Sequence, residues 1–369
     1  MRKMIRQIAL LLLWCASALP ARAACDWPEW QQFKRDYMTA EGRVVDPSDA
    51  RRITTSEGQS YALFFALVND DRETFELVLN WTERELAKGD LTGFLPAWLW
   101  GQQGDKWGVL DANSAADSDL WIAYSLLEAG RLWQNHSYES IGTMLLRRIA
   151  REEVARVPGL GPVLLPGPKG FVAENRWTIN PAYLPPQLLA RVAGMQGPWQ
   201  EMHKQWPAML MASAPGGFAP DWVDWQQPTG WVSNAKHGDR GSYDAIRVYL
   251  WVGMLSADDP AKQQLVAHFS PMQAYINRTG QVPERIDTAT GKVEGSGAGG
   301  FAAALLPLMQ GEPALEALRE QVGQRGWDAH AYYGSVLTLF GSGWDQQRYR
   351  FAANGNLIPR WSEQCHQPE

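Results

Sequence analysis

The feature that most constrains the fold of this 369-residue chain is a helical spacing of apolar residues that recurs along most of its length. Between Asp119 and Trp133, for example, Ile122, Leu126 and Ala129 follow the i, i+4, i+7 spacing of a helix with one buried face. Such patterns predict twelve helices, over residues 28–39, 57–68, 72–88, 118–134, 138–155, 185–194, 199–213, 243–256, 260–277, 300–310, 313–323 and 329–341.

Twelve helices joined in pairs predict an all-α protein, built either as an open solenoid or as a closed α/α barrel. The sequence has no repeat of fixed period, which favours the barrel. Residues 163–172 and 218–232 contain Gly, Pro and short β-favouring runs, which predict minor hairpins. Because no Pro-rich or Ser-rich linker interrupts residues 25–369, we expect them to form a single domain.

The first 24 residues are typical of a secretory signal peptide. Three basic residues precede an apolar run at residues 8–19, and residues 21–23 form an A-x-A cleavage site. The apolar run is too short to span a bilayer, so we expect an exported protein without a membrane anchor, in the periplasm or the medium. The alternative of a lipoprotein acylated at Cys25 is weakened by Arg22, three positions earlier.

Two cysteines remain after removal of the signal peptide, Cys25 and Cys365 at the two ends of the chain. An oxidising compartment favours a disulfide between them, which would join both ends of one domain. The alternative is two unpaired thiols.

Charge and aromatic content narrow the class of ligand. The net charge is −6, and it becomes −10 once the signal peptide, with four basic and no acidic residues, is removed. This balance argues against a nucleic-acid partner, whose phosphates require a basic surface. The chain has 19 Trp, 11 Tyr and 11 Phe, more than its core obviously needs, and flat aromatic faces suit sugar rings. The six His form no metal-binding motif, so no metal or cofactor is expected.

Three acidic residues lie where predicted helices begin. Ser56 and Gln59 have the spacing of a capping box, which would place Glu57 in the first turn of a helix. Asp117 and Asp244 begin two later helices. If these ends meet at one end of a barrel, they supply the paired acids that cleavage of a glycosidic bond requires. The alternative for Glu57 is an acid that only stabilises the helix N-terminus.

Candidate substrate-binding residues accompany these acids. Arg247 follows Asp244 by one helical turn and could hold it ionised, although a surface i, i+3 ion pair has the same spacing. Trp107, Tyr183 and Tyr332 lie beside polar or Pro-rich loop residues rather than within apolar stripes, so we expect them to stack on sugar.

Three separated motifs together resemble glycoside hydrolase family 8. They are residues 54–61 (TTSEGQSY), residues 115–133, which begin AADSD, and residues 243–247 (YDAIR). The resemblance extends from about residue 25 to residue 365 and is strongest to periplasmic endoglucanases that accompany bacterial cellulose synthase. The chain departs from the family pattern at Ala116, where Ser or Thr is usual, and at Ser118, where Ala or Gly is usual. Both changes leave the carboxylates in place.

The resemblance implies an (α/α)6 barrel that hydrolyses internal β-1,4 bonds of cellulose-like glucan with inversion. It implies Glu57 as general acid and Asp244 as general base. Asp117 would hold and distort the sugar, with nucleophile as the alternative role. It further implies a β-1,4-glucan chain as substrate and a cellulose synthase complex as a partner.

One physical conflict accompanies the role of Glu57. A helix N-terminus favours the charged carboxylate, whereas a general acid must carry a proton at working pH. We expect Asp117, Asp244 and desolvation by bound glucan to favour the protonated acid.

Two other functions fit the same residues. A noncatalytic glucan-binding protein associated with cellulose synthase would need the aromatic residues but not the carboxylates. A lyase acting on acidic polysaccharide could share the helical barrel, but a net charge of −10 would repel its substrate.

Overall fold

The structure is a computed structural model, and it describes residues 26–325 and 327–365. The predicted signal peptide at residues 1–24 lies outside the described residues. Cys25 and the side chain of Cys365 also lie outside them, so the disulfide stays a prediction.

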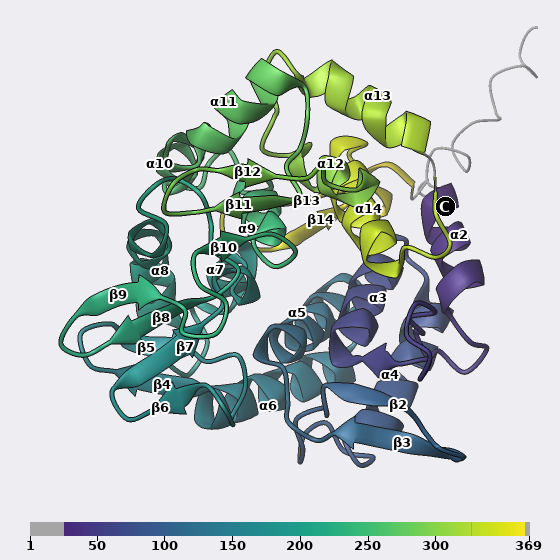
Figure 1. Ribbon diagram of the computed structural model, residues 1–369. Coiled ribbons are helices and arrows are strands. Elements are labelled where there is room, and N and C mark those ends of the chain that lie inside the picture. The colour runs from purple at the N-terminus through teal and green to yellow at the C-terminus, as the bar shows by residue number, and fades with distance from the viewer. Residues whose placement is uncertain (1–25, 326, 366–369) are drawn as a thin grey trace, which may run out of the picture.

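Six helices form an inner ring at the centre of the molecule (Figure 1). Each packs against the next along the chain, and Phe340 of the last helix meets Phe65 of the first with ring centroids 4.7 Å apart, which closes the ring. The inner helices are α3 (Ser56–Val68), α5 (Ala116–Leu132), α7 (Pro186–Val192), α9 (Ile246–Gly253), α12 (Gly299–Leu305) and α14 (Tyr332–Asp345).

Inner and outer helices differ in how much of their surface is apolar. Every residue of α9 is buried, and in α3 only Glu57 is not, because side chains on all sides of these helices face the protein. The outer helices bury one stripe, as α6 does through Gly142, Leu145, Leu146 and Ile149. The outer helices are α2 (Pro28–Tyr37), α4 (Arg72–Leu86), α6 (His136–Glu152), α8 (Trp199–Ser213), α10 (Lys262–His268), α11 (Ser270–Thr279) and α13 (Leu315–Arg325).

Each inner helix has an outer partner. α2 packs on α14, α4 on α3, α6 on α5, α8 on α7, α10 on α9 and α13 on α12. α12 and α14 approach closely where Gly341 has no side chain, since a Cβ there would lie 1.8 Å from the carbonyl oxygen of Ala303.

The predicted helices are present, with differences at their ends. The predicted helix over 260–277 is two helices, α10 and α11, because Pro271 lies in the first turn of α11 and lacks the N–H that a continuous helix needs. The helix predicted over 243–256 begins only at Ile246, so Asp244 lies in the turn before it.

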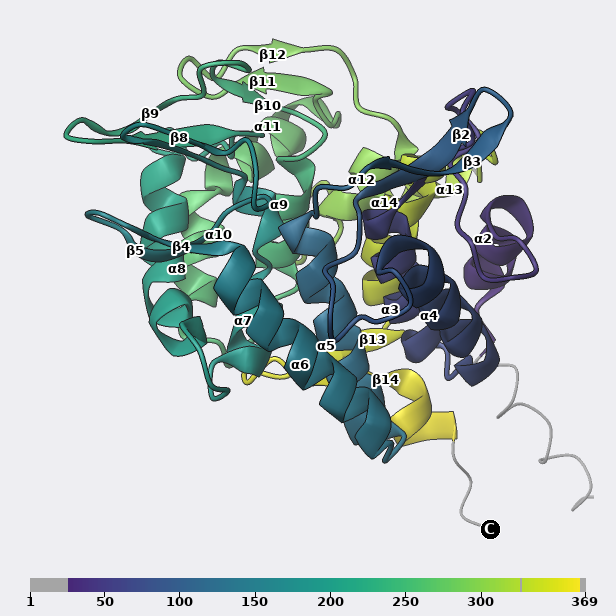
Figure 2. The same cartoon turned by 90° about the horizontal axis from the view of Figure 1, so that it is seen from below.

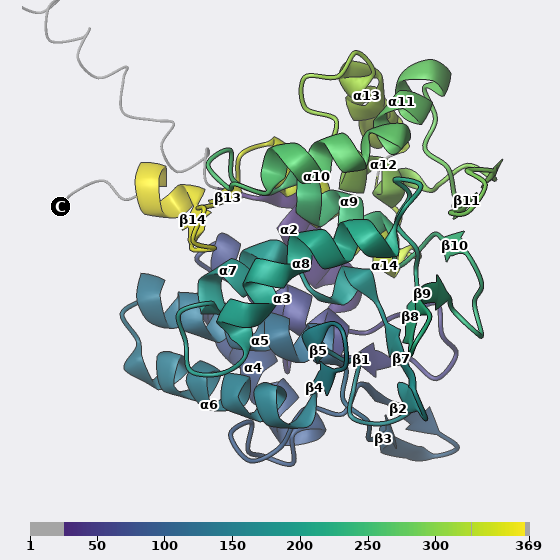
Figure 3. The same ribbon diagram turned by 90° about the vertical axis from the view of Figure 1, so that its left-hand side faces the viewer.

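Antiparallel strands gather mainly at one end of the barrel (Figure 2). The predicted hairpin region 218–232 contains β8 (Val223–Gln226) and most of β9 (Gly230–Ser233), which form one sheet with β6 (Val172–Ala173) and β7 (Arg176–Ile179), seen from the side in Figure 3. The hairpin predicted over 163–172 is wrong, because these residues hold the end of one strand and the start of another, which lie in different sheets. β4 (Val154–Val157) pairs with β5 (Gly161–Leu164). The remaining strands were also not predicted; they are β1 (Thr54–Thr55), β2 (Leu99–Gln103), β3 (Lys106–Asp111), β10 (Arg240–Gly241), β11 (Arg285–Asp287), β12 (Val293–Glu294), β13 (Tyr349–Phe351) and β14 (Leu357–Pro359). β13 and β14 lie at the opposite end of the barrel (Figure 2).

Among the described residues, no helix combines the length and the apolar character that crossing a membrane requires.

The closure of the ring makes Phe340 a test of the fold. Its ring is 1% exposed and lies within 5.5 Å, between centroids, of aromatic rings on α3, α5 and α9. We expect Phe340→Ala to lower the free energy of unfolding by about 3–5 kcal/mol, because the cavity lies where three helices meet. Urea unfolding measures this loss.

The control is Leu77→Ala, at a 39% exposed position of α4, which should change the stability by at most about 0.5 kcal/mol. Equal losses in both variants would contradict this account of ring closure.

Candidate active site

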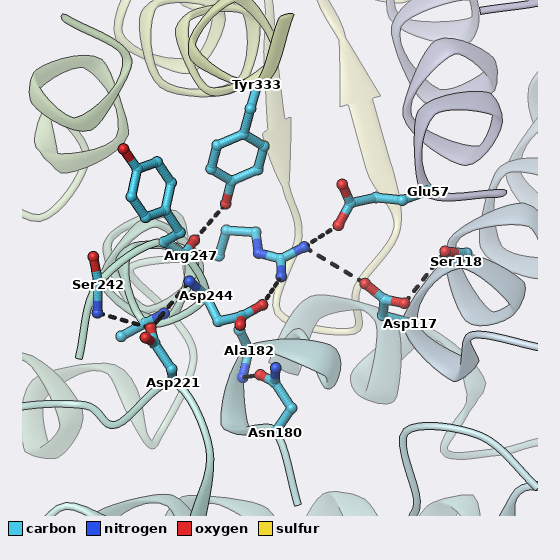
Figure 4. Close-up of polar contacts among 12 residues, drawn as sticks. Glu57, Asp117, Ser118, Asn180, Ala182, Asp221, Ser242, Asp244, Arg247 and Tyr333 are labelled. Atoms are coloured by element: carbon cyan, nitrogen blue, oxygen red, sulfur yellow. Dashed lines mark hydrogen bonds and ion pairs between the residues drawn. The ribbon is translucent and has the colours of Figure 1, made fainter. Parts of the chain in front are cut away.

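One buried guanidinium joins three carboxylates from three inner segments (Figure 4). Arg247 Nη1 lies 2.5 Å from Glu57 Oε2 and 3.5 Å from Asp117 Oδ2. Arg247 Nη2 lies 2.6 Å from Asp244 Oδ1. The arginine side chain is only 4% exposed, so its pair with Asp244 is not a surface ion pair. The structure therefore brings together the four charged residues that the sequence singles out.

Glu57 reaches this cluster from the first turn of α3. The N-cap of α3 is Thr55, whose hydroxyl accepts a hydrogen bond from the first turn. The predicted capping box of Ser56 and Gln59 is wrong, because Ser56 is already helical and Gln59 is fully buried. The Gln59 side chain accepts instead from the backbone N–H of Val44, 2.7 Å away. The consequence for Glu57 is unchanged, since it still lies at the start of the helix.

Solvent reaches the three carboxylates unequally. The side chains of Glu57 and Asp244 are each 25% exposed, whereas that of Asp117 is 4% exposed. Glu57 and Asp244 are therefore more accessible to a substrate than Asp117.

Burial and mutual repulsion alter the proton affinity of two of these acids. Burial raises the pKa of Asp117 to about 7, with a further contribution from the negative charge of Glu57, while Arg247 opposes the increase. Burial also raises the pKa of Asp244, again against the effect of Arg247. A higher pKa makes the Asp244 carboxylate a stronger base, which suits proton abstraction from water.

Three tyrosines lie beside the arginine, and the hydroxyl of one, Tyr61, accepts from Arg247 Nη1 at 2.9 Å. The ring centroid of Tyr183 is 5.7 Å from the Arg247 guanidinium carbon, and that of Tyr333 is 6.0 Å away. The ring of Tyr332, predicted to stack on sugar, is buried instead and packs on Phe33 and Tyr37. The reason is helix register, because neighbouring residues of α14 point in directions about 100° apart. Tyr333, which the sequence analysis did not name, lies beside Arg247 instead.

Trp107 lies on the β2–β3 hairpin. Its ring is 46% exposed and stacks on Trp100, with centroids 5.4 Å apart. Arg43 lies over both rings. An exposed indole on this hairpin is available to a sugar ring, and its role in binding stays a prediction.

Asn180 is a site residue that the sequence analysis missed. Its Oδ1 accepts from the N–H of Ala182 at 3.0 Å, which caps the short turn leading to Tyr183. Its side chain lies beside Asp244 (Figure 4). The Asn-Pro pair at residues 180–181 is the local signal that marks this turn.

The part of the chain that the structure describes contains no group of three or more His, Cys, Asp or Glu side chains that could hold a metal ion. Arg247 supplies the positive charge that lies between Glu57, Asp117 and Asp244.

Protonation of Asp117 gives a prediction on stability. Its pKa of about 7 lies above the ordinary value near 3.9, so the folded protein binds this proton more tightly than the unfolded chain. The resulting stability is complete below about pH 4 and is lost as the pH rises to about 7. Since Asn imitates the neutral acid, we expect Asp117→Asn to remove about 1 kcal/mol per pH unit of this decline.

Urea unfolding at a series of pH values between these limits measures the difference. The control is Asp49→Asn, because hydrogen bonds from Arg51 lower the pKa of the half-buried Asp49 to about 2 and this carboxyl does not titrate in the interval. If Asp117→Asn and the parent lose stability with pH in parallel, Asp117 is not the group that takes up the proton.

Comparisons with known proteins agree with this site and fold. The family model described as glycosyl hydrolases family 8 matches residues 1–347. The chain is 50% identical over 359 residues to an endoglucanase of Escherichia coli (strain K12), covering 97% of each chain. It is 51% identical over 350 residues to an endoglucanase of Salmonella typhi, covering 95% of each chain.

The fold has a similarly clear relative. The crystal structure of an endo-1,4-D-glucanase from Vibrio fischeri ES114 matches with a TM-score of 0.86 and 48% identity, over 91% of this chain and 99% of that one. This match and the two rings of helices confirm the predicted (α/α)6 barrel. The chain therefore belongs to glycosyl hydrolase family 8.

Proposed function

We propose that this glycoside hydrolase cleaves internal β-1,4 bonds of cellulose-like glucan with inversion at the anomeric carbon. The observation that carries the proposal is the placement of two solvent-reached carboxylates, Glu57 and Asp244, on different nitrogens of one buried guanidinium. The printed names of the relatives, endoglucanase and endo-1,4-D-glucanase, support the β-1,4-glucan substrate.

The inverting mechanism is what the resemblance to glycoside hydrolase family 8 implies, and the contacts of the two acids with Arg247 are compatible with it. The guanidinium of Arg247 bonds to both, and its width with two hydrogen bonds allows their oxygens to be up to about 7 Å apart. Inverting enzymes keep their acid and base about 6.5–9.5 Å apart, so that a water molecule fits between the base and the sugar.

Each acid then has a separate task. Glu57 donates a proton to the glycosidic oxygen, and Asp244 removes a proton from the water that attacks the anomeric carbon. Asp117 holds the sugar at the cleavage point from its buried position. Arg247 keeps Asp244 ionised and oriented until water is bound.

The sugar rings on either side need flat apolar contacts. Tyr183 beside Arg247 and Trp107 on the exposed hairpin supply rings of this kind. Tyr183 and Trp107 both lie at the end of the barrel where the inner helices begin. A glucan chain bound at this end would pass over Glu57 and Asp244.

The cellular setting is a further part of the proposal. The signal-peptide pattern of residues 1–24 supports export to the periplasm or the medium. The resemblance to endoglucanases that accompany cellulose synthase supports a role in bacterial cellulose production, beside a synthase complex.

Replacing the general acid tests the proposal. We expect Glu57→Gln to reduce hydrolysis of cellohexaose by about 10²–10⁴-fold, because the leaving oxygen then receives no proton. Calorimetric titration should show that cellohexaose still binds. The matched control is Glu73→Gln, an exposed acid in the first turn of α4, which should keep full activity.

Three outcomes separate the alternatives. A Glu57→Gln enzyme that cleaves at the parental rate contradicts the assignment of the acid. A parent protein that binds cellohexaose without cleaving it supports the glucan-binding alternative. Release of products with an unsaturated terminal ring from a polyuronate, assayed in place of cellohexaose, would identify a lyase.

A further inference from the structure

A second buried carboxylate lies directly beneath the turn that carries Asp244. Asp221 is 1% exposed, and its Oδ1 accepts three backbone N–H groups (Figure 4). The donors are Ser242 at 2.7 Å, Asp244 at 3.1 Å and Ala245 at 2.9 Å. Three hydrogen bonds to one charged oxygen fix the path of the backbone through this turn.

Asp221 is itself held in place by the neighbouring strand. Its Oδ2 accepts from Arg240 Nε at 3.1 Å, and its own N–H donates to the carbonyl of Arg240 at 2.7 Å. The carboxylate is therefore tied on one side to Arg240 and on the other to the turn.

The backbone N–H groups of the 242–245 turn need a hydrogen-bond acceptor from another part of the chain. The residue before α9 is Ala245, which has no side chain that could cap the helix. The N–H groups at a helix N-terminus have no partner within the helix, and buried N–H groups without partners are costly. Asp221 supplies the missing acceptor from more than twenty residues earlier in the chain.

We propose that Asp221 is a positioning residue for the reaction: its carboxylate fixes the 242–245 turn and thereby holds the base Asp244 against Arg247. This inference rests on the proposed role of Asp244. Asp221 does not touch the reacting atoms, and it acts through the backbone of the residue that does.

The charge of Asp221 has a second effect that can be measured. Burial raises the pKa of Asp244, and the charges of Asp221 and Glu57 raise it further, whereas Arg247 and Asn180 lower the pKa. Removing this charge while keeping an acceptor oxygen should therefore make Asp244 a weaker base that ionises at lower pH.

Two substitutions separate the hydrogen bonds from the charge. Asp221→Ala removes both, and we expect kcat on cellohexaose to fall about 10–100-fold with KM changed less than about twofold, because the base is displaced from the attacking water. Asp221→Asn keeps one oxygen for the three N–H groups. It should lose less activity and shift the acidic limb of the kcat/KM profile to lower pH.

The matched control is Asp224→Asn. Asp224 is also fully buried, forms an ion pair with Arg176 and accepts a hydrogen bond from the backbone N–H of Ala235. Unlike Asp221, it contacts the 234–238 loop and not the turn of Asp244. We expect it to lower the thermal unfolding midpoint without moving the pH profile. If Asp221→Ala does not fold, Asp221→Asn and its pH profile carry the test.

The outcomes distinguish this inference from the proposed function. Asp244→Asn is measured in parallel, and full activity in that variant overturns the role of Asp244 itself. If Asp244→Asn is inactive while Asp221→Asn keeps the parental pH profile and Asp221→Ala keeps the parental kcat, only the positioning role is overturned. A pH shift of the same size in Asp224→Asn also overturns it.

Discussion

The ion pairs of Arg247 with three carboxylates are the interaction on which the site at the end of the barrel depends. Glu57, Asp117 and Asp244 would repel one another if they were ionised together without a cation. A guanidinium can satisfy several carboxylates at once because its donors point in fixed, divergent directions. Removing it would leave three acids with uncompensated charge at the end of the barrel, which is far costlier than losing a surface ion pair.

The arrangement of the helices makes this cluster possible. Inner helices alternate with outer ones along the chain, so residues at or just before the beginnings of α3, α5 and α9 meet around Arg247 (Figure 4). The positive ends of the helix dipoles favour carboxylates there. The aromatic contacts of Phe340 across the ring hold these helices together below the site. Packing in the core thus determines how far apart the acids lie.

Much of the fold follows from local patterns, and much of the site does not. Apolar periodicity predicted the helices, and the acids at helix starts predicted Glu57 and Asp117. The contact of Arg247 with Glu57 spans 190 residues, and no local signal reveals it. Tyr332 was predicted to stack on sugar because it lies beside polar loop residues, but which side of α14 faces the site depends on the register of the helix, which the sequence does not show. Asp221 lies in a loop without a motif, and only its three N–H partners show what it does.

The measurement that tests the account most directly is time-resolved proton NMR of cellohexaose during cleavage by the mature protein. It identifies the anomer of the new reducing end before mutarotation mixes the two forms. Inversion by Glu57 and Asp244 predicts that the α-anomer appears first, because water attacks opposite the leaving glucan. If the β-anomer appears first, the enzyme retains configuration, and a carboxylate nucleophile such as Asp117 has to replace the acid and base pair described above.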